Sequence, residues 1–107
     1  MDFRVNISPA DAVRLLQDGI ARGSISGTFI DQYVAGDVCV MVFEKYFMRT
    51  GARVSLTVTV HPAGPGLTAV HSVGSGGSKG ALINFDWGAS GSFVNSAEQV
   101  LAPYIVR

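Results

Sequence analysis

The chain has 107 residues, of which 48 % are hydrophobic and only 15 % are charged. Eight basic residues balance eight acidic ones and are scattered singly, which argues against a nucleic-acid surface, because such a surface needs clustered positive charge. The length fits one domain, so we expect residues 1–107 to fold as a single unit.

Cysteine content and apolar run lengths bear on where the protein resides. Cys39 is the one cysteine, so an internal disulfide is impossible, and its apolar neighbours predict an inert buried thiol. The first residues lack a basic region followed by an apolar stretch, which argues against a signal peptide. No apolar run approaches the ~20 residues that span a bilayer. We therefore expect a cytoplasmic protein without membrane contact.

The first predicted element is a helix that begins after Ser8 and ends at Gly23. Ser8 suits the N-cap and Pro9 suits the first helical position. Glycine at the end is a common helix stop. The apolar residues between them repeat at helical spacing, at Val13, Leu16 and Ile20.

Four strand-like runs follow, over residues 24–34, 38–48, 53–61 and 67–73. Short turns between consecutive strands require antiparallel neighbours, so the runs predict a four-stranded meander. Residues 81–87 are a candidate fifth strand. The run 38–48 is apolar on both faces, which predicts an interior strand covered on both sides. Helices can cover one side, and we expect a second copy of the chain to cover the other.

The last predicted element is a C-terminal helix with Ser92 as its cap and Pro103 limiting its length. The predicted order is α-β-β-β-β-(β)-α. Two helices that flank an antiparallel meander pack on one face of it, so we predict an α+β two-layer sandwich. The helical stripe consists of Phe93, Ala97, Val100, Leu101 and Tyr104.

The glycine-rich segment 74–80 reads GSGGSKG, yet it matches neither common nucleotide motif. A phosphate loop requires serine or threonine after its lysine, but Gly80 follows Lys79. The dinucleotide pattern G-x-G-x-x-G fails because its sixth position is Lys79. We expect a structural turn or bulge here, while an anion-binding nest with Lys79 stays open as an alternative.

The two histidines can be placed by the register of the hairpin that joins the third and fourth strands. A turn centred on residues 62–66 makes partners sum to about 127, which pairs Leu56 with His71. His71 then lies on the apolar face and His61 on the opposite face. We therefore predict that they share neither a metal nor a proton, and we expect no metal or other cofactor.

Glu44 interrupts the apolar run 38–48 together with Lys45, and neighbours in a strand point to opposite faces. The favoured prediction is an ion pair of Glu44 with Arg49 or Arg53 at the rim of the sheet.

The alternative places Glu44 on the helix-covered face, near Tyr46 and His71. A carboxylate there would have a raised pKa and would be a candidate acid or base. Asp86 is a candidate helix cap or ligand contact.

Trp87 either walls a pocket or seals the core. With Phe29, Tyr46 and Tyr104 it would line a pocket between the sheet and the C-terminal helix. A meander closed by such a helix is similar to part of the helix-grip fold, whose members hold apolar ligands between sheet and helix.

Five segments of the chain carry a resemblance: Gly23–Gly27, Val42–Arg49, Ser55–Val60, Gly74–Gly77 and Asn84–Gly88. Together they resemble a family of small uncharacterised bacterial proteins, chiefly of clostridia and their relatives. The resemblance covers nearly the whole chain, and the family is a domain of unknown function. It implies a stand-alone bacterial cytoplasmic domain but no activity, cofactor or catalytic residue.

The favoured functional prediction is an interaction domain without enzymatic activity that forms a homodimer through the second face of the sheet. The low charge and the doubly apolar run 38–48 motivate it. A binder of small apolar molecules is the first alternative, and an enzyme that uses Glu44 or His71 is the second. The candidate ligand-binding residues are Glu44, Tyr46, His71, Lys79, Asp86 and Trp87.

Overall fold

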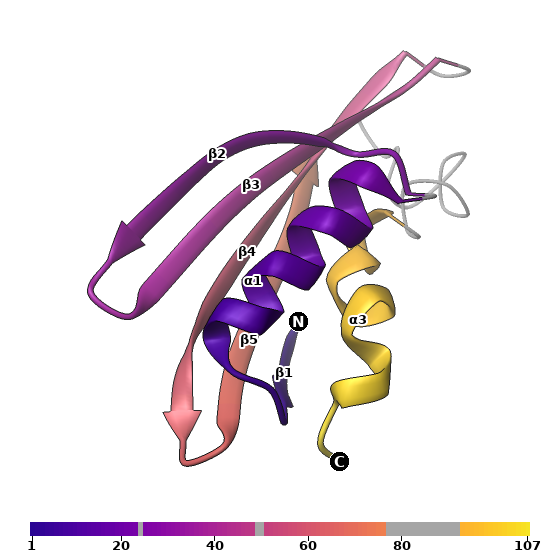
Figure 1. Ribbon diagram of the computed structural model, residues 1–107. Coiled ribbons are helices and arrows are strands. Elements are labelled where there is room, and N and C mark those ends of the chain that lie inside the picture. Colours follow the sequence, from indigo (N-terminus) through magenta and orange to yellow (C-terminus); the bar gives the residue numbers. More distant parts are fainter. Residues whose placement is uncertain (24, 49–50, 77–92) are drawn as a thin grey trace.

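A computed structural model describes residues 1–23, 25–48, 51–76 and 93–107 (Figure 1). A five-stranded antiparallel sheet has the strand order β1-β5-β4-β3-β2, and the helices cover one of its faces. The predicted α+β two-layer arrangement is confirmed. The strands are β1 (Asp2–Val5), β2 (Thr28–Ala35), β3 (Val38–Phe47), β4 (Ala52–Gly64) and β5 (Leu67–Gly76).

The first helix begins and ends where the sequence predicts. Helix α1 (Pro9–Leu16) starts after Ser8, whose hydroxyl accepts a hydrogen bond of 3.1 Å from the backbone N–H of Asp11. The helix continues as a π-helical turn, η1 (Gln17–Arg22), and Gly23 caps its end. The wider π-helical turn was not indicated by the sequence.

The C-terminal helix α3 (Ser96–Leu101) lies beside α1 and continues as a 3₁₀ turn, η2 (Ala102–Tyr104). The predicted stripe packs into the core: Phe93, Ala97 and Leu101 are buried. The predicted cap at residue 92 lies outside the described residues. No helix in the described ranges is long and apolar enough to cross a bilayer.

The fifth strand lies at the N-terminus, and the candidate range 81–87 falls outside the described residues. Strand β1 pairs with β5, and the N-terminal amine donates a 2.7 Å hydrogen bond to the carbonyl of Ser72. The C-terminal residues also bond to β1, because the backbone N–H of Val106 donates a 2.8 Å hydrogen bond to the carbonyl of Arg4. These long-range backbone bonds order a strand too short to be recognised from periodicity.

The register between β4 and β5 differs from the prediction. Leu56 pairs with Gly74, three residues beyond the expected His71. Strand β4 runs through Pro62 to Gly64 with a bulge between these residues, and the turn falls at residues 65–66. Because side chains alternate between faces, a shift by an odd number moves every side chain of β5 to the opposite face.

The core lies between the inner face of the sheet and the helices. Strand β3 is interior to the sheet as predicted, between β2 and β4. Its outer face carries Val38, Val40 and Val42, which are half-buried and which the helices do not cover. Cys39 is buried on the inner face, and burial raises the pKa of its thiol. The largest fully buried side chains include Phe43, Phe93, Leu16, Ile20, Met41, Leu56 and Leu101.

Ser72 is a weak point of this core, because its hydroxyl is buried without a hydrogen-bond partner in the described ranges. Replacing Ser72 by alanine should raise the free energy of unfolding by about 1 kcal/mol, since the desolvated hydroxyl is removed. Chemical denaturation followed by circular dichroism measures this change.

Thr68 provides the matched control for Ser72 on the same face of β5. Its buried hydroxyl donates a 2.6 Å hydrogen bond to the carbonyl of Ile7, so Thr68→Val should destabilise the protein. Equal losses for Ser72→Ala and Thr68→Val would contradict the prediction.

Candidate functional site

Glu44 lies on the outer face of the sheet, at its rim. Its carboxylate is 3.3 Å from the guanidinium of Arg53, so the structure shows the favoured ion pair. The same guanidinium lies 5.0 Å from the ring centroid of Tyr46. Lys45 points to the opposite face, where its ammonium donates a 2.7 Å hydrogen bond to the carbonyl of Ile25. Glu44 is therefore not the carboxylate that faces the helices.

His71 lies on the outer face, and the prediction that it belongs to the apolar face is wrong. Its Nδ1 is 2.5 Å from Oδ1 of Asp2, across the β1–β5 pair. The hydrogen bond from His71 is the main cause that lowers the pKa of the Asp2 carboxyl. The bulge near the end of β4 explains the error, because it displaces the register of β5.

The two histidines share a face, contrary to the prediction that they lie on opposite faces. Nδ1 of His61 is 2.9 Å from the carbonyl of Pro62, which can only accept, so the imidazole N–H donates. His61 pairs with Ala69 and His71 pairs with Thr59, so the histidines are diagonal neighbours on adjacent strands. Within the described ranges they form no metal-binding group of three or more ligands.

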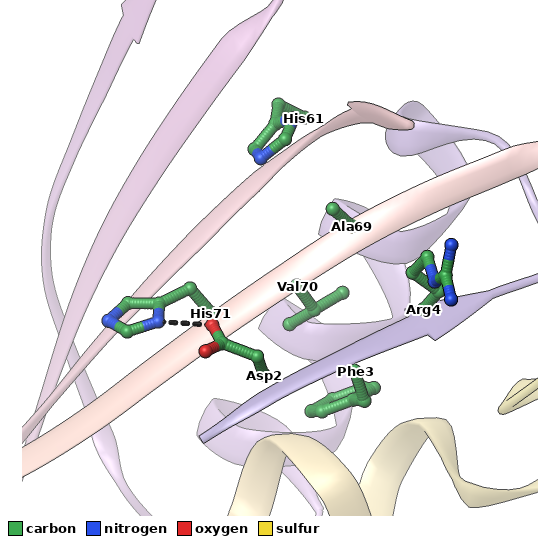
Figure 2. A pocket seen from close by; sticks show the side chains of 7 residues that line it. All are labelled: Asp2, Phe3, Arg4, His61, Ala69, Val70 and His71. Atoms are coloured by element: carbon green, nitrogen blue, oxygen red, sulfur yellow. Dashed lines mark hydrogen bonds and ion pairs between the residues drawn. The ribbon is translucent and has the colours of Figure 1, made fainter. Parts of the chain in front are cut away.

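A hollow of about 360 Å³ opens on the outer face around these side chains (Figure 2). Its lining comes from β1, β4 and β5, which are adjacent in the sheet. An imidazole, a guanidinium and a carboxylate–imidazole pair surround a small apolar floor, which suits a polar or charged ligand rather than an apolar one. The lining residues are Asp2, Phe3, Arg4, His61, Ala69, Val70 and His71.

Among the sequence-based candidates that the structure describes, Glu44 and Tyr46 both lie beside Arg53, whereas His71 bonds to Asp2 on the β1 side of the sheet. Lys79, Asp86 and Trp87 lie outside the described residues. Tyr46 is on the outer face of the sheet, whereas Tyr104 packs against the core in the helical layer. The described side chains of the expected apolar pocket are therefore on different layers.

Asp2 and Arg4 were missed because β1 was not predicted. The signal that could have found them is the alternation of these charged residues with Phe3 and Val5, a strand pattern over four residues. Such a short alternation has little weight until a neighbouring strand pairs with it.

Strand β2 is a second exposed feature, at the edge of the sheet opposite β1. Every residue of β2 is exposed, and none of the described strands pairs with the edge of β2 that faces away from β3. The exposed fractions of its large apolar residues are 41 % for Phe29, 52 % for Ile30, 66 % for Tyr33 and 57 % for Val34. An edge of this kind is a template for a further strand.

A comparison with curated proteins found no match for the chain. The family of unknown function DUF6054 matches residues 1–105, which is nearly the whole chain. This finding confirms the resemblance to a domain of unknown function. The chain therefore belongs to the DUF6054 family, whose function is unknown.

Proposed function

We propose that the chain is an interaction domain that self-associates by pairing the β2 strands of two copies. The observation that carries the proposal is the concentration of exposed apolar side chains on this strand. Of the nine large hydrophobic residues that are exposed in the described ranges, four belong to β2. A strand with a free edge and this much exposed apolar surface is an association site unless something covers it.

The exposed side chains of β2 lie on both faces of the sheet. Phe29 and Val34 pair with buried residues of β3 and share the inner face, while Tyr33 pairs with Val40 on the outer face. Stacking two sheets face to face would cover Tyr33 but leave Val34 in water. An added strand covers side chains on both faces at once, which favours pairing at the edge.

The predicted dimer, in which two outer faces stack, would need an apolar outer face, but much of this face is polar. Strands β4 and β5 present hydroxyl and imidazole groups there, including Thr57, Thr59 and His71. The apolar side chains of this face lie mainly on β3, next to β2, where Val38, Val40, Val42 and Tyr46 point outward. Val73 of β5 is also exposed on this face, opposite Thr57. This distribution moves the expected interface from the centre of the sheet to its β2 edge.

The geometry of β2 suits a two-fold arrangement. A bulge between Phe29 and Asp31 interrupts the strand, and the regular run after it is Asp31–Ala35, with Tyr33 at its middle. Antiparallel pairing about Tyr33 places Tyr33 beside its counterpart and Asp31 opposite Ala35 of the second copy. Aromatic cross-strand pairs are stabilising, and this register keeps the two aspartates apart.

The test is the oligomeric state in solution, measured by sedimentation velocity up to about 100 µM, a range chosen for a weak interface of one strand pair. We expect the wild-type chain to reach twice the monomer mass and Val34→Lys to remain monomeric, because lysine on an edge strand opposes pairing. Met48→Lys is the control, since Met48 is 85 % exposed and lies outside β2.

A third variant separates edge pairing from face-to-face stacking. Val42→Lys places a charge on the outer face of β3 and should leave edge-paired dimers intact. Dissociation by Val42→Lys but not by Val34→Lys would contradict edge pairing. A wild-type chain that stays monomeric throughout would overturn self-association altogether. Thermal melting of each variant verifies that it is folded.

A further inference from the structure

The hollow around Ala69 lies at the opposite edge of the sheet from β2. Two strands, β4 and β3, separate β5 from β2, so pairing of β2 leaves the hollow accessible. Three residues of its lining lie side by side across the strands, because Arg4 of β1 pairs with Ala69 of β5 and Ala69 pairs with His61 of β4. Its properties therefore go beyond the proposed self-association and do not depend on it.

The shape of the hollow follows from one small residue between long ones. Ala69 contributes only a methyl group, while its cross-strand neighbours Arg4 and His61 rise on either side. Figure 2 shows His61, Arg4 and the His71–Asp2 pair around Ala69. Arg4 and His61 are two strands apart, about 10 Å in the plane of the sheet, which leaves room for a small group between their side chains.

Arg4 brings a permanent positive charge that forms no ion pair with a described residue. Its side chain is exposed and makes no hydrogen bond or ion pair within the described ranges. The one carboxylate of the lining, Asp2, is hydrogen-bonded to His71. The guanidinium is therefore available to a ligand with its fork of N–H donors.

The imidazoles each have one nitrogen left for a ligand. Nδ1 of His61 is bonded to Pro62, and Nδ1 of His71 is bonded to Asp2, so Nε2 of each ring has no partner among the described residues. Protonation turns Nε2 into a donor and adds a positive charge, and histidine side chains gain this charge close to neutral pH.

We infer that this hollow binds a tetrahedral oxyanion, such as the phosphate group of a small molecule. Donors from three strands surround one floor, and a tetrahedral anion has oxygens to accept from all three, whereas a carboxylate has only two. A metal cation is disfavoured because the uncompensated guanidinium would repel it. The anion gains a charge-assisted hydrogen bond from Arg4 and further ones from protonated His61 and His71.

Binding should strengthen as the pH falls. The charged and titratable groups that face the hollow are Asp2 and Arg4 from β1, His61 from β4 and His71 from β5. The hydrogen bond from His71 lowers the pKa of the Asp2 carboxyl, so Asp2 stays charged at mildly acidic pH, where an ordinary histidine side chain gains a proton. The net charge around the hollow therefore becomes more positive on acidification.

Isothermal titration of the full chain with sodium sulfate tests the inference, because the charge of sulfate is constant between about pH 5.5 and about pH 8.5, the range over which histidine changes charge. We expect measurable binding at the lower pH and at least about tenfold weaker binding at the higher pH. At the lower pH, Arg4→Gln should weaken binding about tenfold or more. Arg53→Gln, on the same face but outside the lining, is the matched control and should bind like the wild type.

A steric variant tests the site independently of charge. Ala69→Leu fills the floor and should abolish binding while all charged groups remain. Binding that persists in Arg4→Gln, or that falls equally in Arg53→Gln, would overturn the site. Acetate that binds as tightly as sulfate would overturn the tetrahedral class. Thermal melting shows that each variant is folded, so loss of binding is not mistaken for loss of structure.

Discussion

Replacing Phe43 by alanine should lower the free energy of unfolding by about 3–5 kcal/mol, the range for removing a buried phenylalanine. Phe43 is fully buried on the inner face of β3 and pairs with Leu56 of β4. Its ring also meets the edge strand, since its centroid is 5.7 Å from that of Phe29 in an edge-to-face arrangement. The change therefore removes apolar burial and leaves a cavity between the sheet and the helices.

A loss of this size is a large fraction of the free energy of unfolding of a small domain, which is about 5–15 kcal/mol in total. The variant should unfold at much lower denaturant concentration, or fail to fold, as measured by urea denaturation with circular dichroism. Met48→Ala is the control. Met48 directly follows β3 and is 85 % exposed, so its replacement should change the free energy of unfolding by less than about 0.5 kcal/mol. A loss below about 1 kcal/mol for Phe43→Ala would contradict its position at the centre of the core.

Replacing Gly74 by alanine should destabilise the protein by about 1–3 kcal/mol, the usual cost of overpacking. Gly74 lies in β5 opposite Leu56, and the side chain of Val94 packs against it. A Cβ atom at residue 74 would come within 2.1 Å of Cγ1 and 2.7 Å of Cβ of Val94. Because the second contact is close to the backbone of Val94, rotation of that side chain cannot remove the clash.

Val94→Ala provides the test of this mechanism in a double-mutant cycle. Removing the two methyl groups of Val94 clears the 2.1 Å contact but leaves the 2.7 Å contact with Cβ, so the double variant should recover part of the loss caused by Gly74→Ala. Thermal or urea denaturation of the two single variants and the double variant gives the coupling. Additive losses would show that contact with Val94 is not the reason for glycine at this position.

The sequence was sufficient for elements whose signals are local. Ser8 and Gly23 mark the ends of the first helix because capping depends on a few neighbouring residues. The alternation in β4 and the short turns predicted antiparallel neighbours, because turn length restricts how consecutive strands can meet. The apolar run of β3 correctly placed that strand inside the sheet.

The register of β5 could not be obtained in the same way. One bulge near Pro62 and a turn displaced to residues 65–66 moved His71 from the predicted apolar face to the outer face. Each feature involves only one or two residues. Because side chains alternate between the two faces of a strand, the resulting shift in register nevertheless moves every side chain of β5 to the other face. The hollow beside Ala69 follows from this register, so the sequence-based candidates included His71 but not its neighbours.

The sequence by itself thus determined the α+β class, the antiparallel meander, the ends of the first helix and the absence of an internal disulfide. Only the tertiary structure decided that residues 2–5 form the fifth strand, that His61 and His71 share a face with Arg4, and that β2 is exposed on both sides. The physical reason is how far apart in the sequence the interacting residues lie. Caps, turns and periodicity arise from residues close in the chain, whereas strand pairing and exposure depend on long-range backbone hydrogen bonds and on where the helices pack.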